Sequence, residues 1–484
     1  MLSLEATPEK MAKLLDKLGK VYGGMYTLWM PHPTVVITDY ELMKEALVAN
    51  ADALSGRVEH YMMDMIMGGR YGMVNMSGQA FREQRRFALH HLRDFGFGRY
   101  SMEAKINVEL DRLLQHLSAK VRDQTKTNQD TGNMAPVLHV RSAVLGCIAS
   151  IIGMVTFGTN YHIENDERID DEMMLEDLFL QAMTNPKGQL ITMVPPLRFL
   201  PPFRQFHAKM AKQTQRAHEY LKSHTDKQTK ELETCPDDEA PNIGIAFLQE
   251  MERRRRKDEP LGSFSRWQHT MLLTNLWSAG AETTVSTLCW GIVFMAAWPE
   301  VQAKAFSEID AVLGREQRVS MADRVRLPYL HACALETQRL ASIIPVNIPH
   351  VTTADVRIRA QFIPKGTAVL PQIYSVLHEE RHFLDPDEFR PERFIVTRQN
   401  GGDICLNQKL IDRVIPFGMG KRQCLGESLA RMEIFLILTT LLQKFDFQLT
   451  KEDRAKSRKE LMKSDSSTFV RRALLDQFYV SLRD

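Results

Sequence analysis

The sequence predicts a mainly α-helical protein with a minor β part, folded as a single domain over residues 1–484. Apolar side chains recur at helical spacing through most of the chain, while strand-like runs are short and lie next to turns with Pro or Gly. No internal repeat or interdomain linker interrupts this pattern. We expect helices over residues 102–116, 140–157, 203–233, 243–254, 265–298, 299–313, 328–340 and 427–444.

The amino-terminal segment has the pattern of a capped helix. Thr7 suits the cap, Pro8 suits the first turn and Gly19 suits the end. The apolar face of this helix is formed by Met11, Leu14, Leu15 and Leu18. Neither a signal peptide nor a membrane anchor is visible in this segment, so we expect the chain to begin inside folded structure.

Two pairs of short strands are expected to form one small sheet. The first pair covers residues 25–30 and 34–38, and the second pair flanks the turn Ile363-Pro364-Lys365-Gly366. Residues 450–467 are rich in Ser, Lys and Glu, which is typical of a surface excursion. A last strand is expected over residues 477–482.

A long apolar run over residues 271–298 predicts the central helix of the fold. Its length also suits a membrane span, but Asn275 and Glu282 interrupt it, and Pro299 begins a new helix directly after it. We therefore interpret the run as a helix that crosses the interior of the protein.

Composition narrows the class of partner and compartment. Lys and Arg number 62 against 60 Asp and Glu, so no overall field favours nucleic acid, and any charged docking surface must be local. The six cysteines lack the paired spacing of disulfide frameworks or zinc sites. A reducing compartment is therefore expected.

The most informative stretch is a Gly-rich loop over residues 416–427 that leads into an apolar helix. Cys424 lies at the entrance of that helix, where backbone amides and the nearby Lys421 and Arg422 are expected to lower the pKa of its thiol. Phe417 offers an aromatic face, and Arg422 can pair with a carboxylate. The glycines that let the backbone approach a flat ligand are Gly418, Gly420 and Gly426.

This loop resembles the haem-binding signature of cytochromes P-450, with Phe, Gly, Arg, Cys and Gly all at the family's spacing. Five fixed positions would coincide by chance in roughly one chain in ten thousand. The resemblance implies a haem-thiolate monooxygenase that holds haem b (iron protoporphyrin IX) with Cys424 as the axial ligand. It also implies the family's fold, a helical domain with a long central helix and a small β-sheet region.

The resemblance further implies a buried charge network behind the cysteine loop. Glu336 and Arg339 share one helix face, and Arg393 of the stretch Pro391-Glu392-Arg393-Phe394 completes the network. Taken alone, Glu336 and Arg339 would fit a solvated surface pair equally well. Burial is favoured by the apolar neighbours Ala332, Ala334 and Leu335.

Residues 279–284, Ala-Gly-Ala-Glu-Thr-Thr, are similar to the family's oxygen-binding motif in the central helix. The resemblance implies that Thr283 holds the hydrogen bond through which protons reach dioxygen, and that Glu282 passes protons inward. Without the cysteine motif, a Gly packing contact and a Thr bonded to its own helix would explain the same residues.

Haem propionates require cations, and the resemblance gives this role to three residues, Arg422, Arg85 and His350. Arg85 lies in the segment where the family has Trp, three residues and Arg. Phe81 stands in place of that Trp and removes an indole donor.

From about Leu18 onward the chain is most similar to animal microsomal members of the drug- and steroid-metabolising group. The resemblance implies electrons from NADPH-cytochrome P-450 reductase or a cytochrome b-type donor, and a small apolar substrate such as a fatty acid, steroid or xenobiotic. It places the protein at the cytosolic face of the endoplasmic reticulum, although the anchor and Pro-rich hinge of those members are not recognisable, which suggests a shortened form or an unusual gene product.

Residues 190–203 resemble the loop with which those members contact the membrane surface, although a loop packed on the core would have the same composition. The substrate pocket is expected to draw on residues 55–75, 179–183, 276–279, 342–348 and 467–469. One alternative function is a haem-thiolate protein that isomerises hydroperoxides or binds gas without outside electrons. Glu282 and Thr283 argue against it, because such proteins need no proton relay.

Overall fold

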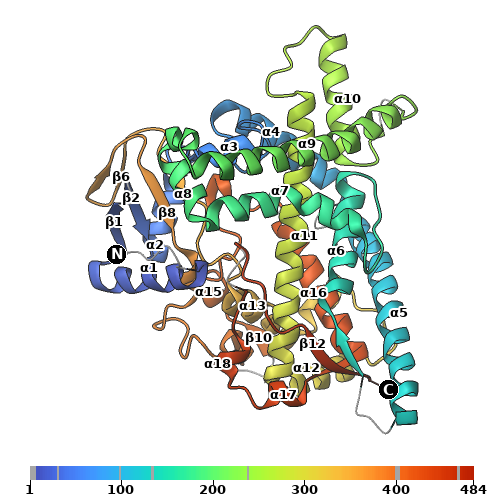
Figure 1. Ribbon diagram of the computed structural model, residues 1–484. Helices are drawn as coiled ribbons and strands as arrows, with labels where there is room; N and C mark the ends of the chain where they lie inside the picture. The colour runs from blue at the N-terminus through green and yellow to red at the C-terminus, as the bar shows by residue number, and fades with distance from the viewer. Residues whose placement is uncertain are drawn as a thin grey trace.

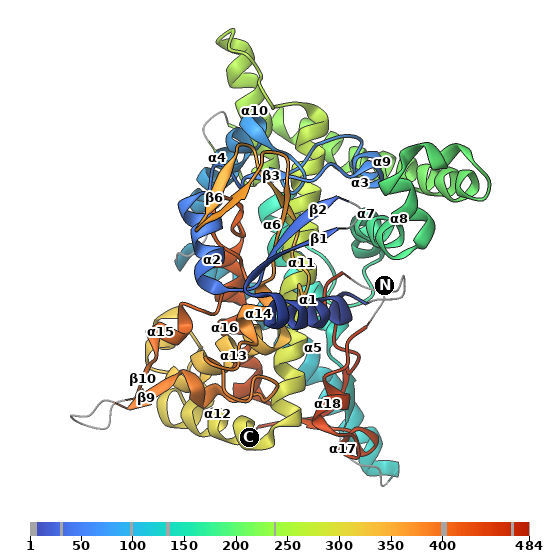
Figure 2. The same ribbon diagram turned by 90° about the vertical axis from the view of Figure 1, so that its left-hand side faces the viewer.

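The computed structural model describes residues 7–29, 32–96, 100–131, 136–236, 239–397, 404–465 and 469–483. Helices make up most of these residues, and the long helix α11 (Arg266–Ala297) runs through the middle of the molecule (Figure 1). The strands form small separate groups, as the second view also shows (Figure 2). The mainly α class with a minor β part is confirmed.

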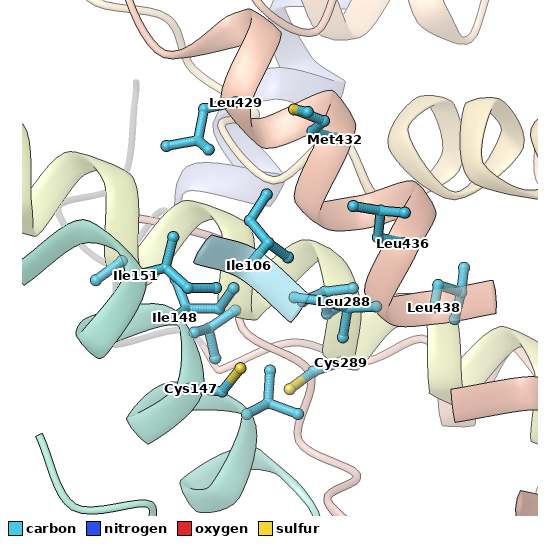
Figure 3. Close-up of a cluster of buried hydrophobic side chains, with 14 of the residues drawn as sticks. Ile106, Cys147, Ile148, Ile151, Leu288, Cys289, Leu429, Met432, Leu436 and Leu438 are labelled. Carbon is cyan, nitrogen blue, oxygen red and sulfur yellow. The ribbon is translucent and has the colours of Figure 1, made fainter. Parts of the chain in front are cut away.

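Helix α11 is fixed by a polar cap and an apolar surround. The Ser265 hydroxyl accepts the N–H of Gln268 at 3.1 Å, and nearly every later side chain of the helix is buried. Side chains from α5 (Tyr100–Thr131), α6 (Arg141–Thr156), α11 and α16 (Glu427–Lys444) converge in one apolar cluster (Figure 3). Residues 271–298 thus lie in a helix of the protein interior, and α12 (Pro299–Val312) follows it after a bend of 104°.

Helix α1 (Pro8–Tyr22) begins where predicted but ends later. Thr7 caps it by accepting the N–H of Lys10 at 3.3 Å. Gly19 does not end the helix, because the chain continues to Gly23, whose φ of +97° stops it. A Cβ on Gly19 would lie 2.5 Å from the Thr38 hydroxyl, so this glycine permits close packing of the helix against the sheet.

The largest sheet has the strand order β1-β2-β8-β5-β3. Its strands are β1 (Met25–Trp29), β2 (Pro33–Ile37), β8 (Ala368–Pro371), β5 (His350–Val351) and β3 (Gly56–Arg57). β2 pairs with β8 in parallel, whereas the other neighbours are antiparallel. The register places Arg57 directly opposite His350, which brings two distant segments to one place.

The prediction of one small sheet is wrong for the strands around the Ile363 turn. The strand before the turn, β7 (Gln361–Ile363), pairs with β6 (Val356–Ile358) in a hairpin of its own, and only β8 after the turn joins the larger sheet. The predicted last strand is present as β12 (Gln477–Leu482), paired with β11 (Phe445–Leu449) and β4 (Val137–His139). A further pair consists of β9 (Ile395–Thr397) and β10 (Ile404–Leu406).

The predicted helices are present, with α5 extending well beyond residue 116 and α10 beyond residue 254. Helix α7 (Glu167–Thr184) was not among the helices predicted from the apolar period, although residues 179–183 within it were expected to line the pocket. Residues 450–467 contain two short helices. The remaining α-helices are α2 (Tyr40–Lys44), α3 (Tyr61–Ile66), α4 (Gly78–Asp94), α7 (Glu167–Thr184), α8 (Pro186–Met193), α9 (Phe203–Leu232), α10 (Ile243–Arg256), α13 (Pro328–Ala341), α14 (Ile373–Leu377), α15 (Gln408–Ile411), α17 (Lys451–Arg454) and α18 (Arg458–Leu461).

Among the described residues, no single helix is long and apolar enough to cross a membrane, and only the bent pair α11 and α12 passes that test together. Residues 190–203 cover the end of α8 and a 3₁₀ turn, Pro195–Phe199. Ile191 packs inside, while the side chains of Leu190, Met193, Val194, Phe199 and Leu200 are exposed. The segment therefore carries an exposed apolar face and one buried anchor.

Candidate active site

The cysteine loop, the middle of α11 and the segment after α13 surround an interior cavity of about 350 Å³. Cys424 has accessible surface, but that surface opens into this cavity and not onto the outside of the molecule. Most of the wall is apolar, with Leu276, Ile343, Ile344 and Ile348 among its side chains. The cavity therefore presents one thiol to a largely apolar space.

The cysteine loop has a fixed backbone conformation. The Cys424 N–H donates to the Phe417 carbonyl at 3.0 Å, and residues 420–422 form a single 3₁₀ turn. Gly418 and Gly420 have φ of +71° and +76°, in the region that favours glycine. A Cβ on Gly420 would also collide with the carbonyl oxygen of Leu47. These two glycines let the loop fold tightly under the cavity.

Burial raises the pKa of the Cys424 thiol, and the N–H groups of Gly426 and Glu427 together with Arg85 act in the opposite direction. The prediction that Lys421 and Arg422 lower this pKa is wrong. Lys421 forms an ion pair with Asp52, and Arg422 donates to backbone carbonyls instead. Coordination to a metal ion, which deprotonates a thiol ligand outright, would supply the missing stabilisation of the thiolate.

Three guanidinium groups, those of Arg57, Arg85 and Arg422, reach the cavity. Burial lowers the pKa of Arg57 to about 10, and burial with the neighbouring Arg57 and Arg85 lowers that of Arg422 to about 9. Within the part of the chain that the structure describes, none of the three forms an ion pair with a carboxylate. Their N–H groups donate to the backbone carbonyls of Ser55, Met73, Val74, Met76, Pro349 and Gln423.

Arg57 lies in the predicted pocket segment 55–75, but sequence reasoning did not identify it as a cation of the site. It lies in a segment with no helical or strand period of note, and its part in the site depends on the pairing of β3 with β5. A lone Arg after Ser55-Gly56 carries no local signal for that pairing. Its position in the cavity follows only from the tertiary structure.

The Phe81 side chain has no hydrogen-bond donor, but its ring contacts the arginines of the site. The guanidinium carbon of Arg422 lies 3.4 Å from the centre of the Phe81 ring, which is a close cation–π contact. Arg85 lies 5.9 Å from the same ring. Replacing Trp by Phe thus removes a donor while keeping an aromatic face for the arginines.

His350 lies in the cavity wall, but not as the cation that we expected. Its Nδ1 donates to the Leu54 carbonyl at 2.7 Å, and burial, helped by Arg57, lowers its pKa to about 3. The neutral ring then presents Nε2 as an acceptor. His350 can bind a carboxylate only after it gains a proton, and its role toward a propionate stays a prediction.

One stripe of α11 is accessible although the helix around it is buried. Leu276, Ala279, Gly280 and Thr283 follow each other at helical spacing, and all four line the cavity. The Thr283 hydroxyl donates to the Ala279 carbonyl at 2.6 Å. A Cβ on Gly280 would lie 2.9 Å from the Ile152 side chain, so α11 and α6 approach closely at this point.

Glu282 does not line the cavity. Its predicted role of passing protons inward would require a position there. Its carboxylate forms ion pairs with Arg141 at 2.8 Å and Arg472 at 2.7 Å, and it accepts the Ser286 hydroxyl at 2.8 Å. The proton-passing role of Glu282 remains a prediction, and its observed contacts are those of a buried ion pair.

The charge network behind the loop is buried. Arg339 donates to the Glu336 carboxylate at 2.7 and 2.9 Å, and Arg393 donates to it at 2.9 Å. The remaining guanidinium hydrogens go to backbone carbonyls, among them those of Leu377 and Pro386. The network thus ties α13 to the segment that precedes the cysteine loop.

The predicted substrate-pocket segments are only partly in the cavity wall. Residues 276 and 279 and several from 342–348 line it, as do Arg57, Met73 and Val74 from the first segment. Residues 179–183 do not line it, and Phe179 packs with its ring centre 6.1 Å from that of Phe469. Residues 466–468 lie outside the described part of the chain.

The model of the cytochrome P450 family matches residues 1–474. The chain belongs to the cytochrome P450 family. It is 34% identical to cytochrome P450 2C23 of Rattus norvegicus, over 91% of this chain and 83% of the relative. It is also 34% identical to cytochrome P450 2C55 of Mus musculus, over 92% and 85%. The probable cytochrome P450 CYP36A1 of Caenorhabditis elegans is 31% identical, over 92% and 86%.

Family membership makes the chain a haem-dependent monooxygenase, and the site fits a haem on independent grounds. A thiol that can serve as a soft ligand faces the cavity, three guanidinium groups beside it have no carboxylate partner among the described residues, and the walls are mostly apolar. A porphyrin carries one metal ion, two carboxylates and an apolar face. The thiol, the guanidinium groups and the apolar walls match these three features in turn.

We expect Glu336→Ala to yield little haem-loaded protein. The change leaves Arg339 and Arg393 buried without their carboxylate, and removing one partner of a buried pair costs roughly 3 to 5 kcal/mol. The measurement is haem content per protein, together with the unfolding temperature. Glu300→Ala is the matched control, because Glu300 pairs with Arg458 at the surface and its loss should change little. Normal haem loading in Glu336→Ala would contradict the expectation.

Proposed function

We propose that this cytochrome P450 takes electrons from NADPH through a separate reductase and inserts one oxygen atom of O₂ into a small apolar substrate such as a fatty acid, steroid or xenobiotic. The second oxygen atom leaves as water, with two electrons and two protons consumed. One observation carries the proposal: the Cys424 thiol and the Thr283 hydroxyl line the same apolar cavity. The prosthetic group proposed is haem b.

When bound, the haem supplies the activation of dioxygen. Cys424 Sγ would be the iron ligand, and Arg57, Arg85 and Arg422 would hold the two propionates. Thr283 Oγ1, which donates to its own helix at rest, can turn to hold a proton at the oxygen site. The apolar walls would orient the substrate and exclude bulk water.

The composition of the cavity wall supports the proposal of an apolar substrate. Leu276, Ala279, Ile343, Ile344 and Ile348 give no charged group to pair with a polar substrate. A ligand that enters this part of the cavity is therefore selected by apolar burial and shape.

We place the protein at the cytosolic face of the endoplasmic reticulum membrane. The support is the exposed apolar face of residues 190–203, where Phe199 is 66% and Leu200 54% exposed. An apolar face of this kind binds a membrane surface by burying its side chains at the headgroup boundary.

Cys424→Ser should abolish the red-shifted Soret band that the reduced, carbon-monoxide-treated protein is expected to show. The band depends on electron donation by a thiolate ligand, which a hydroxyl does not provide. The absorption spectrum of the reduced protein measures it. Cys405→Ser, in β10, is the matched control and should keep the band. A normal band in Cys424→Ser would overturn the ligand assignment.

Thr283→Ala should keep haem binding but send electrons into hydrogen peroxide at the expense of product. Loss of a proton-holding hydroxyl typically costs roughly 10² or more in the assisted step. The readout is product and peroxide formed per NADPH with a reductase present. Thr274→Val is the control, since Thr274 makes the same bond to its own helix but lies outside the cavity. If no NADPH is consumed and hydroperoxides are isomerised, the alternative function holds.

Electron transfer from an acidic reductase should slow as ionic strength rises. Arg82, Arg86, Arg93 and Lys421 are exposed on α4 and the cysteine loop, and Arg85 joins these two elements by donating to the Gln423 carbonyl at 2.7 Å. Salt screens steering of this kind. Stopped-flow reduction measures the rate, and Arg82→Glu or Lys421→Glu should lower it while leaving substrate binding unchanged.

The control for this docking surface is Arg255→Glu. Residues 253–256 form the last turn of α10, where Arg255 pairs with Glu252. Reversal there should leave the reduction rate unchanged. A larger effect at Arg255 than at Arg82 would refute the docking model.

A further inference from the structure

Glu433, on α16, is a second acidic residue near the oxygen site, and it differs from Glu282 in every contact. It is 1% exposed and lines the same cavity as Thr283 and Cys424. Its Oε2 lies 3.4 Å from the hydroxyl of Thr284, the residue after Thr283. Its Oε1 is buried without a hydrogen-bond partner in the described part of the chain.

The surroundings of Glu433 disfavour a negative charge. Its neighbour Met432 belongs to the apolar cluster where α5, α6, α11 and α16 meet (Figure 3). Among the described residues, no cation forms an ion pair with it. The titratable neighbour is the buried Cys147 thiol on α6, which also faces Glu109 and Arg112 of α5. An unpaired carboxylate in such a place is costly unless it carries a proton.

Burial raises the pKa of Glu433 to about 8, and the hydrogen bond from Thr284 only partly opposes this. The carboxyl group is therefore largely protonated at neutral pH and loses its proton as the pH rises through about 8. Glu282 instead pairs with two guanidinium groups and accepts a hydroxyl, and it does not line the cavity. Of these two acids, Glu433 is the one that lines the cavity.

We propose that Glu433 is a proton store for the oxygen site, acting through the hydroxyl of Thr284. This inference rests on the proposed monooxygenase function. Glu433 acts through another residue, so it positions and holds the proton and does not touch the reacting atoms.

The number of protons is conserved in this transfer. The Thr284 hydroxyl, which donates to Glu433 Oε2 in the structure, first turns its hydrogen toward the oxygen side of the cavity. The Oε–H of Glu433 then gives its proton to Thr284 Oγ1 while the Thr284 hydroxyl gives its own proton to the oxygen side. Glu433 is left as a carboxylate and takes up one proton from the solvent before the next passage. One proton is delivered for each such passage, and the reaction uses two for each product.

The first test reads the proton itself in the ferric holoenzyme, without turnover. Infrared difference spectra of wild type against Glu433→Gln should show a carboxylic-acid C=O band at neutral pH that shifts in D₂O and disappears as the pH is raised through about 8. Absence of such a band from the difference spectrum would mean that Glu433 is ionised, and would overturn the proposal.

The second test reads the relay during turnover with a reductase. Product formed per NADPH should fall in the wild type as the pH rises through about 8. Glu433→Gln should lower it already at neutral pH, on the order of tenfold, and should remove the pH step. Glu433→Asp, which keeps an acid, should restore part of the yield and the step. Unchanged yield and pH profile in Glu433→Gln would overturn the relay.

Thr284→Val tests the path, since it keeps the branched shape and removes only the hydroxyl. It should reproduce the profile of Glu433→Gln, and the double variant should lose nothing further, because both changes cut the same path. Additive losses would show that Glu433 does not act through Thr284.

The matched control is Glu172→Gln. Burial also raises the pKa of Glu172 to about 8, but its carboxyl lies beside His224 at 3.2 Å, away from the cavity. Its loss should remove a protonated carboxyl while leaving product yield unchanged. If the wild type consumes no NADPH at all, the proposed function fails; if it couples normally and Glu433→Gln matches it, only the relay fails.

Discussion

Three like charges held beside one apolar cavity set the main electrostatic constraint on this structure. The guanidinium groups of Arg57, Arg85 and Arg422 are half-buried around the same cavity, and loss of hydration lowers the pKa of each. Backbone carbonyls accept hydrogen bonds from these guanidinium groups. They carry no full negative charge that could offset the positive charges of the three arginines. An arriving dianion relieves this repulsion, so haem binding and stability of the fold should be coupled.

The elements that meet at this cluster come from distant parts of the sequence. Arg57 lies on β3, Arg85 on α4 and Arg422 in the cysteine loop, and the pairing of β3 with β5 brings His350 to the same place. The Glu336 network behind the loop pairs one carboxylate with the two guanidinium groups of Arg339 and Arg393, and backbone carbonyls accept further N–H groups of Arg339. This second cluster therefore contains a carboxylate of its own, whereas among the described residues no carboxylate pairs with Arg57, Arg85 or Arg422.

The parts that could be predicted from the sequence are those with a local pattern. Capped amphipathic helices, the Gly-rich loop and the long apolar run each carry their own period or turn residues, and Cys424, Thr283 and the Glu336 network stand where these patterns predict. Gly19 was misjudged because a mid-helix glycine and a helix end look alike until the partner, Thr38, is known. The strands around Ile363 were misjudged because a turn does not reveal which sheet each strand joins.

The site residues that were missed or misjudged depend on contacts across the fold. The sequence around Glu282 does not indicate that Arg141 and Arg472 form ion pairs with its carboxylate. In the structure these ion pairs hold the carboxylate outside the cavity wall, whereas its predicted role would require a position in that wall. Nothing near Glu433 in the sequence announces that no described cation forms an ion pair with it. Since the contacts of a buried acid are set by partners that arrive from other elements, two glutamates of equal local appearance acquire different surroundings, and only the three-dimensional structure separates the acid with two guanidinium partners from the acid whose pKa burial raises.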